Sequence, residues 1–397
     1  ILVMASSMNC LFNARVHVPR RKHGIGAQKA FAGVQVPKAR RRVQLSASRS
    51  LTMRTIASVD MKHVIERLCA REDFTMSEST ETLEALLASN DPAQIAAFLV
   101  LLRAKGETAE EVAGLAQAMR NSAVSCDCGP GVLDIVGTGG DGIGSVNIST
   151  GSCLLAAAAG AKVAKHGSRS VSSMCGSADV LEALGVAVDL GPEGVQACVK
   201  ETNMGFMFAP RYHPAMKAVG PVRKSLGVRT TFNILGPMLN PANADYGLVG
   251  VYSPSVIPLM INSLKLLGMK RALVVHSMGL DELVPMGPAT VAELKDGKVV
   301  LYEFEPLDVG IKRCTVEDLK GGDRFLNAEI LRDSLSGTPG PVADALALNA
   351  GVALHACGVA PESVAQGVTM ALEVQRSGAG LKLLDAWVAK SQEEKRK

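Results

Sequence analysis

The stretch from residue 134 to residue 150 reads Asp-Ile-Val-Gly-Thr-Gly-Gly-Asp-Gly-Ile-Gly-Ser-Val-Asn-Ile-Ser-Thr. The apolar run 133–136 predicts a short strand, and the small residues of 149–159 predict the helix that follows. Glycines between them let the backbone approach a ligand and expose successive N–H groups. Because the positive end of the helix faces the same place, the stretch predicts an anion-binding loop.

This loop contains G-x-G-x-x-G at Gly137, Gly139 and Gly142, the pattern of dinucleotide-binding proteins, but three features disagree with that interpretation. Residues 143–147 separate the last glycine from the helix, and the second predicted strand ends in Lys165 rather than in an acid. Asp141 would also repel a pyrophosphate unless a metal ion or a ribose hydroxyl intervened. A tight turn alone would not need so many glycines and polar residues. The stretch therefore favours a different phosphate ligand.

The segments around the loop alternate between strand and helix patterns, which predicts an α/β fold with a mainly parallel central sheet. Predicted strands are 161–164, 186–190, 205–208, 247–252 and 273–276, predicted helices are 179–184, 192–201 and 255–267, and residues 291–304 form a hairpin around Asp296-Gly297. Residues 342–389 predict two helices joined around Gly358. A helical pattern fills 61–122 and returns at 213–227. We therefore expect a small helical domain at 60–132, joined by helices around 211–236, and an α/β domain at 133–397.

The net charge of +4 averages two unlike parts of the chain. Residues 1–59 contain eleven Lys or Arg and no Asp or Glu, which leaves 31 basic against 38 acidic residues from 60 onward. A basic, acid-free leader is typical of an organelle transit peptide, and a nucleic-acid-binding arm is the alternative. Since the acidic body offers no nucleic-acid module, we expect a transit peptide over 1–59 and no nucleic-acid partner. No apolar run reaches the length of a membrane span, so no membrane partner is expected.

A second polar loop, Lys165-His-Gly-Ser-Arg-Ser-Val-Ser-Ser173, follows the next predicted strand and precedes a helix that Ser177 caps. The carboxyl ends of parallel strands meet at one edge of a sheet, so this loop should lie beside the first. Lys165 supplies a point charge, and the hydroxyls and amides supply donors. The loop predicts a second phosphate cradle, with a solvated surface loop as the alternative.

Two further segments carry candidate chemistry. Asp281-Glu282 follows the strand 273–276, and adjacent carboxylates suit Mg²⁺ when phosphates complete its shell, although such a pair alone is usually plain surface. Pro210 and Pro214 frame a turn that presents Tyr212 and His213. Arg223 follows on a predicted helix, where it suits a planar carboxylate, with a surface ion pair as the alternative.

Together these segments resemble the anthranilate phosphoribosyltransferase family. The matching motifs run in order from about residue 61 to 389: Gly137-Thr-Gly-Gly-Asp141, Asn147-Ile-Ser-Thr150, Lys165-His-Gly, Ser172-Ser173, Gly205-Phe-x-Phe-Ala-Pro, His213-Pro-Ala-Met216, Pro221-Val-Arg223, Arg229-Thr-x-Phe-Asn-x-Leu-Gly-Pro237 and Gly279-Leu-Asp-Glu282. The resemblance implies a fold like that of the nucleoside phosphorylases, usually dimeric, and a plant-type enzyme in the chloroplast stroma. It also implies a reaction in tryptophan biosynthesis, in which anthranilate and phosphoribosyl pyrophosphate give N-(5-phosphoribosyl)anthranilate and pyrophosphate.

The resemblance also implies residue roles, position by position. Phosphoribosyl pyrophosphate should be held by Gly137, Gly140, Asp141, Ser145, Asn147, Ile148, Ser149, Thr150, Lys165, His166, Gly167, Ser168, Arg169, Ser170, Val171, Ser172, Ser173 and Ser177. Anthranilate should meet Gly137, Ser168 and Arg223, with His166, Tyr212 and His213 along its approach. Mg²⁺ should be held by Ser149, Asp281 and Glu282. No proton acceptor is identified, and an uncharged aromatic amine needs no strong base before it attacks.

One position departs from the family pattern. The family usually has Asn after Lys-His-Gly, where this chain has Ser168, which is shorter and offers one hydroxyl instead of an amide. The departure bears on anthranilate binding rather than on the phosphate chemistry. A catalytically silent homologue that binds a ligand or a partner is the alternative function, and a pyrimidine nucleoside phosphorylase of the same fold is a second.

Overall fold

The computed structural model describes residues 59–170 and 174–397. Apart from Val59, the predicted leader lies outside the described residues. Three residues of the second polar loop, Val171, Ser172 and Ser173, also lie outside them.

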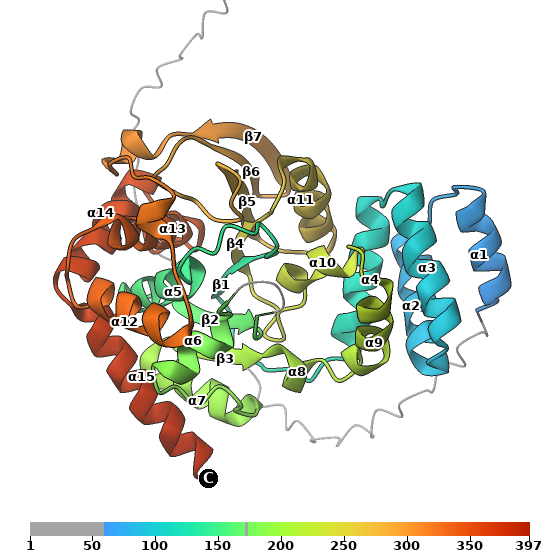
Figure 1. Ribbon diagram of the computed structural model, residues 1–397, viewed down its shortest axis with the longest axis horizontal. Coiled ribbons are helices and arrows are strands. Elements are labelled where there is room, and N and C mark those ends of the chain that lie inside the picture. The colour runs from blue at the N-terminus through green and yellow to red at the C-terminus, as the bar shows by residue number, and fades with distance from the viewer. Residues whose placement is uncertain (1–58, 171–173) are drawn as a thin grey trace, which may run out of the picture. The chain divides into compact units, whose positions relative to one another are not determined.

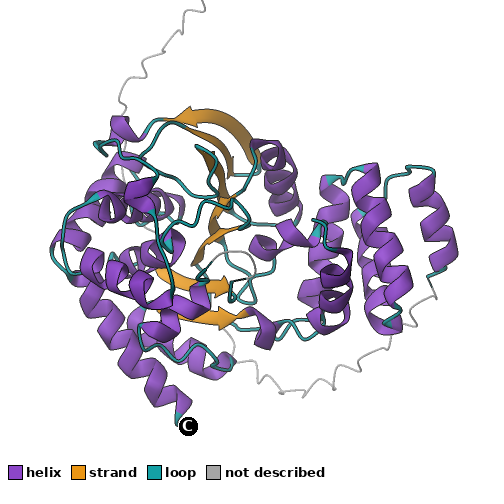
Figure 2. Cartoon of the chain, viewed as in Figure 1, coloured by secondary structure: helices purple, strands orange, loops and turns teal. Residues whose placement is uncertain are grey.

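The α/β part is built on a seven-stranded sheet (Figures 1 and 2). In spatial order its strands are β3 (Met204–Phe208), β2 (Lys162–Gly167), β1 (Val132–Gly137), β4 (Tyr246–Gly250), β5 (Arg271–Ser277), β6 (Ala289–Lys295) and β7 (Lys298–Phe304). The first five are parallel and the last two antiparallel, which confirms the predicted fold class. The order reverses between β1 and β4, where open parallel sheets place their ligands.

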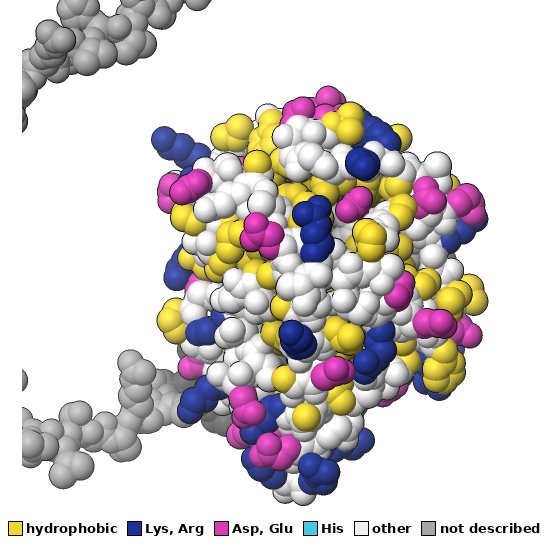
Figure 3. All heavy atoms as spheres, turned by 90° about the vertical axis from the view of Figure 1, so that its left-hand side faces the viewer, with side chains coloured by type: hydrophobic (Ala, Val, Ile, Leu, Met, Phe, Trp, Pro, Cys, Tyr) yellow, Lys and Arg dark blue, Asp and Glu magenta, His cyan; other side chains and the backbone are white. Residues whose placement is uncertain are grey.

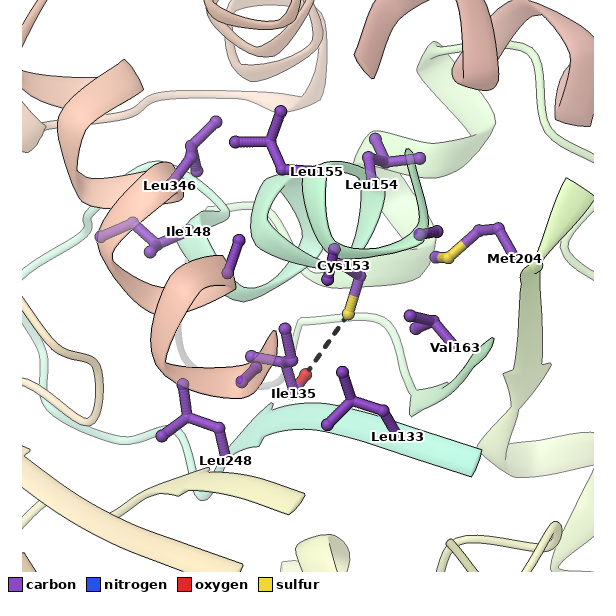
Figure 4. Close-up of a cluster of buried hydrophobic side chains, with 14 of the residues drawn as sticks. Leu133, Ile135, Ile148, Cys153, Leu154, Leu155, Val163, Met204, Leu248 and Leu346 are labelled. Carbon is purple, nitrogen blue, oxygen red and sulfur yellow. Dashed lines mark hydrogen bonds between the residues drawn. The ribbon is translucent and has the colours of Figure 1, made fainter. Parts of the chain in front are cut away.

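Helix α5 (Ile148–Ala158) packs directly on β1 because its residues are small. A Cβ on Gly151 would lie 2.7 Å from the Leu346 side chain of α13 (Pro341–Ala356), so the two helices require glycine at their contact. Figure 4 shows the buried side chains between α5 and the strands, with the Cys153 Sγ 3.8 Å from the Ile135 carbonyl oxygen. This packing fixes the N-terminus of α5 relative to the end of β1.

The two faces of the sheet belong to two apolar cores. Leu248, Leu273 and Val291 pack in one core with α5 and α13, and with the further helices α6 (Ser177–Ala183), α7 (Pro192–Thr202), α12 (Arg324–Leu335), α14 (Val364–Arg376) and α15 (Ala379–Lys395). Val249 and Val274, one position along their strands, face the second core with α11 (Ile257–Leu266). The alternation follows from the two-residue period of a strand.

The second core continues into the helical bundle formed by α1 (Met61–Cys69), α2 (Met76–Ser89), α3 (Pro92–Lys105) and α4 (Ala109–Asn121). Thr75 and Thr108 each form a capping box with the residue three positions on, and Asp91 caps α3 before Pro92. Such caps contribute about 1 kcal/mol each. After β3 the chain returns to this core through the helices α8 (Ala209–Tyr212), α9 (Met216–Leu226) and α10 (Phe232–Leu235).

Two predictions about secondary structure were wrong. Residues 186–190 belong to no strand, although all of them except the exposed Asp189 are buried. Side chains satisfy part of their backbone: Ser391 Oγ accepts from the Ala187 N–H, and the Tyr212 hydroxyl donates to the Leu190 carbonyl. The apolar run predicted burial correctly and pairing incorrectly. The region 342–389 holds three helices rather than two, since Gly378 takes a left-handed conformation with φ of 68° between α14 and α15. Helix α12 was not predicted.

The described surface carries charges of both signs. On the face shown in Figure 3, Lys and Arg side chains are interspersed with Asp and Glu rather than gathered into one basic patch. None of the described helices combines the length and the apolar character that crossing a membrane requires.

Candidate active site

The glycine loop lies between β1 and α5 at the point where the strand order reverses. Gly139, Gly140, Gly142 and Gly144 all have positive φ, between 69° and 84°, a conformation that other residues adopt only with strain. Helix α5 begins at Ile148, directly after this loop. Ile148 and Thr150 are fully buried, whereas Ser149 is partly accessible, so the first turn of α5 presents backbone amides and one hydroxyl.

Asp281 and Glu282 reach this loop from the segment after β5. The Gly139 N–H donates to Asp281 Oδ2 at 2.5 Å, and the Ser149 N–H donates to Glu282 Oε1 at 3.2 Å. A Cβ on Gly137 or on Gly250 would collide with Asp281, so the ends of β1 and β4 must be glycine for the acid to lie there. The structure thus brings together residues that the sequence placed about 140 positions apart.

Burial raises the pKa of both acids. Desolvation, followed by the charge of Asp141, raises the pKa of Asp281 to about 6. Desolvation and the charge of Asp281 raise the pKa of Glu282 to about 8. Crowded carboxylates whose ionisation is costly are stabilised by a cation, and two carboxylates beside the Ser149 hydroxyl are donors that suit Mg²⁺. Within residues 59–170 and 174–397, no three His, Cys, Asp or Glu side chains are grouped to hold an ion, so phosphate oxygens or water would complete the shell.

Lys165 lies at the floor of the site. It is 1% exposed, and its Nζ donates to the Ile135 carbonyl at 2.6 Å and to Ser149 Oγ at 3.3 Å. A buried ammonium next to Ser149 places positive charge where the loop amides converge. Lys165 therefore joins the glycine loop and the acid pair in one constellation.

The second loop is placed beside the first, at the end of β2, and Ser168 in it is exposed. Arg169 forms ion pairs with Asp179 at 3.0 Å and Glu182 at 2.6 Å on α6, so its guanidinium is committed to that helix. The N–H groups of Ser170 and Gly176 both donate to Asp179 Oδ2, which closes the loop onto the start of α6 at Ser177. The prediction that Arg169 helps to hold phosphoribosyl pyrophosphate stays a prediction, and in this structure its guanidinium pairs with α6.

His166 and His213 meet edge to face, with ring centroids 5.0 Å apart. Burial lowers the pKa of His166 to about 3 and that of His213 to about 4, so both rings are neutral near pH 7. Tyr212 is completely buried, with its hydroxyl bonded to the Leu190 carbonyl at 3.1 Å. Tyr212 therefore anchors α8 in the core, whereas the resemblance predicts that it lies along the approach of anthranilate.

Arg223 lies on α9, half-buried, with its guanidinium 5.6 Å from the centre of the Phe232 ring. Desolvation lowers its pKa, and the ion pairs among the described residues do not include it. A desolvated guanidinium without a protein carboxylate is a binding group for an acidic ligand.

Some residues of the site had no role assigned from sequence. Arg229 donates to the Gly140 carbonyl at 2.6 Å and stacks on Tyr252, which links the segment after α9 to the glycine loop. Asn327 on α12 donates to Asn147 Oδ1 at 2.9 Å. The only sequence signal for Asn327 was the pair Gly321-Gly322 before a helix start, since its partner lies 180 positions away.

Comparison with known proteins identifies the class first. Residues 129–381 match the model described as "Glycosyl transferase family, a/b domain", and residues 62–123 match "Glycosyl transferase family, helical bundle domain". The fold and these two matches thus define a glycosyltransferase.

Individual relatives narrow the class. The chain is 44% identical to the anthranilate phosphoribosyltransferase of Chlamydia felis, over 84% of this chain and 97% of the relative, and 45% identical to that of Haloferax volcanii, over 82% and 99%. The crystal structure of the Thermus thermophilus enzyme superimposes with a TM-score of 0.79 at 45% identity, over 83% of this chain and 99% of that one. The structure of the Saccharomyces cerevisiae enzyme in complex with PRPP (phosphoribosyl pyrophosphate) and Mg superimposes with a TM-score of 0.78 at 25% identity. The match covers 85% of this chain and 99% of that one.

The chain belongs to the anthranilate phosphoribosyltransferase family. Its reaction is the transfer of the 5-phosphoribosyl group from phosphoribosyl pyrophosphate to the amine of anthranilate, in tryptophan biosynthesis.

Proposed function

We propose that the chain carries out this transfer at the switch point between β1 and β4, where Asp281 contacts the Gly139 N–H of the glycine loop and Glu282 contacts the Ser149 N–H at the start of α5. That contact is the observation on which the proposal rests, because it joins a phosphate cradle and a pair of cation ligands in one site. The glycine loop and Lys165 would hold the pyrophosphate and ribose, and Ser149 would join the acid pair around Mg²⁺.

A bound Mg²⁺ neutralises charge on the pyrophosphate leaving group. The chain's own residues do the rest. The loop amides and the Lys165 ammonium are fixed before the reaction, so they stabilise the departing pyrophosphate without reorganising. Arg223 would hold the anthranilate carboxylate and direct its amine to the ribose C1. Since that amine is already nucleophilic, holding both substrates in line supplies much of the acceleration.

A direct assay tests this proposal. Recombinant protein is mixed with phosphoribosyl pyrophosphate, Mg²⁺ and anthranilate, and the loss of anthranilate fluorescence is followed. We expect turnover that EDTA abolishes and that Asp281→Asn and Glu282→Gln each reduce strongly, while both variants keep the thermal unfolding of the parent. Full activity in both variants would contradict the metal assignment, and no turnover in the parent would favour a catalytically silent homologue.

The oligomeric state and the cellular location are separate proposals. A homodimer is what the family resemblance implies, and light scattering after gel filtration tests it. Plastid import is supported by the acid-free basic composition of residues 1–59. A fluorescent protein fused behind these residues should enter plastids, whereas retention outside the organelle would contradict the transit peptide.

A further inference from the structure

Asn327, a buried asparagine on α12, contacts the end of the glycine loop at Asn147. Asn327 is 1% exposed, its Oδ1 accepts from the Gly322 N–H at 2.7 Å, and its Nδ2 donates to Asn147 Oδ1 at 2.9 Å. Asn147 in turn donates from Nδ2 to the Cys175 carbonyl at 3.1 Å. A line of amides thus joins the segment before α12, the glycine loop and the second loop.

This line fixes which way each amide group points. The Gly322 N–H can only donate, so Asn327 must turn its oxygen toward it and its NH₂ toward Asn147. Asn147 must then present its oxygen to Asn327 and its NH₂ to Cys175. One of the two NH₂ hydrogens of Asn147 bonds the Cys175 carbonyl, and the other remains for a ligand oxygen. The orientation of Asn147 as a donor is therefore set by Asn327.

Asn147 is the N-cap of α5, but its side chain does not cap the helix. It precedes α5 at a position where asparagine normally accepts a hydrogen bond from its own helix, yet its side chain makes no capping bond. The side chain is committed to Asn327 and Cys175 instead. This commitment has a cost in helix stability, which indicates a different use for the amide.

The backbone before α12 holds the same loop. The Val146 N–H donates to the Leu319 carbonyl at 2.9 Å, and the Gly321 N–H donates to the Gly144 carbonyl at 3.0 Å. A Cβ on Gly321 would lie 2.5 Å from Asn327 Oδ1 and 3.0 Å from the Val146 Cα, so only glycine fits there. Residues 319–322 therefore hold the glycine loop in place next to Asn147.

We propose that Asn327 is a positioning residue for phosphoribosyl pyrophosphate, which it serves by holding Asn147 with an N–H directed at the ligand. The inference rests on the proposed function, and on the family resemblance, which implies that Asn147 helps to hold phosphoribosyl pyrophosphate.

Asn327→Asp is the decisive variant because it keeps the shape and reverses one contact. The carboxylate still accepts from Gly322, but its second oxygen faces Asn147 Oδ1 and forces that amide to turn over. We expect the KM for phosphoribosyl pyrophosphate to rise about tenfold, the typical effect of losing a group that orients a ligand-binding residue. The KM for anthranilate should stay unchanged.

Gln375→Glu is the matched control. Gln375 on α14 is 2% exposed and donates from Nε2 to the carbonyls of Ser334 at 2.8 Å and Thr338 at 2.9 Å, so it anchors the opposite end of α12. Both variants replace a buried amide by an acid, and both should lower the melting temperature. Only Asn327→Asp should raise the KM for phosphoribosyl pyrophosphate. An equal rise in the control would show that Asn327 merely stabilises α12 and would overturn the inference.

A double-mutant comparison tests whether Asn327 acts through Asn147. We expect Asn147→Ala to raise the KM for phosphoribosyl pyrophosphate, and the addition of Asn327→Asp to raise it no further. Additive effects would overturn the inference. If Asn147→Ala raises this KM and Asn327→Asp does not, the inference is overturned while the proposed function stands. If Asn147→Ala leaves the KM unchanged, the inference is overturned and Asn147 does not belong to the phosphoribosyl pyrophosphate site.

Discussion

Among single residues, Arg223 gives the sharpest test of the acceptor site. Its guanidinium lies against Phe232 and has no carboxylate partner among the described ion pairs, and desolvation by burial lowers its pKa. Arg223→Gln should raise the KM for anthranilate 10- to 100-fold, because a hydrogen bond to a charged group contributes about 1.5–3 kcal/mol. The KM for phosphoribosyl pyrophosphate should not change.

Arg223→Lys serves as the comparison in that experiment. Lysine keeps the charge but loses the planar fork that matches a carboxylate, so its KM for anthranilate should fall between those of the parent and the Gln variant. Steady-state kinetics with each substrate varied in turn measure both values. An unchanged KM for anthranilate in both variants would mean that the carboxylate binds elsewhere.

Ser168 poses a question of specificity at the same scale. The residue is exposed, and its carbonyl accepts from the Ala178 N–H at 3.2 Å, so its backbone is held while its side chain has space. Ser168→Asn should lower the KM for anthranilate, since the longer amide replaces a contact that water otherwise mediates. Ser168→Ala controls for loss of the hydroxyl. The idea fails if the Asn variant binds anthranilate no better than the parent.

At the scale of secondary-structure elements, the end of β4 leaves room for the proposed metal ligand Asp281 because Gly250 has no side chain. A Cβ on Gly250 would collide with the backbone of Asp281, so Gly250→Ala must displace the loop that carries both acids. We expect a higher Mg²⁺ concentration for half-maximal activity, together with a loss of about 1–3 kcal/mol in unfolding free energy from overpacking.

Gly194→Ala is the matched control for that prediction. Its Cβ would meet only ordinary contacts at 3.4 Å, in helix α7, and alanine favours a helix. This variant should be as active as the parent at every Mg²⁺ concentration. Titration of activity with Mg²⁺ and thermal unfolding of both variants separate a metal defect from a general loss of stability.

The elements differ in how far the sequence could predict them. β1, β2 and the glycine loop were predicted because short, mainly apolar segments alternate with helical patterns and because glycines mark a ligand-binding turn. Residues 186–190 gave the same apolar signal, but their backbone bonds to Ser391 and Tyr212, and no local pattern reveals such distant partners. The contact between Asn327 and Asn147 could not be predicted either, because the two residues lie 180 positions apart. The glycine at position 250 is explained by the backbone of Asp281, which packs against it in the folded chain.

Across the described molecule, the active site depends on both apolar cores. The glycine loop and acids are positioned by helices of one core, whereas Arg223 belongs to a helix of the other. Arg103 on α3 donates to the Arg229 carbonyl at 2.5 Å, and Arg229 donates to the Gly140 carbonyl at 2.6 Å, so a helix of the bundle is linked to the glycine loop through two hydrogen bonds. Packing between the cores therefore sets the distance between Arg223 and the glycine loop.

The buried histidines where the second core returns to the sheet make the whole fold sensitive to acid. His213 is 2% exposed, and burial lowers its pKa to about 4. The unfolded chain protonates His213 near pH 6.5, whereas the folded chain does so only near pH 4. The unfolding free energy is therefore at its full value above pH 6.5, and part of it is lost as the pH falls toward 4. Lowering the pKa of His213 from 6.5 to about 4 corresponds to a loss of unfolding free energy on the order of 3 kcal/mol across this pH range.

His213→Gln should therefore flatten the acid side of the stability profile. Glutamine does not titrate, so the variant should lose less unfolding free energy than the parent between pH 6.5 and pH 4.5, while His166 continues to contribute in both. Urea unfolding at pH 7.5, 6.0 and 4.5 measures the slopes, with His63→Gln on the exposed surface of α1 as the control. Parallel profiles for the parent and His213→Gln would show that His213 takes up a proton as readily in the folded chain as in the unfolded one, contrary to its burial.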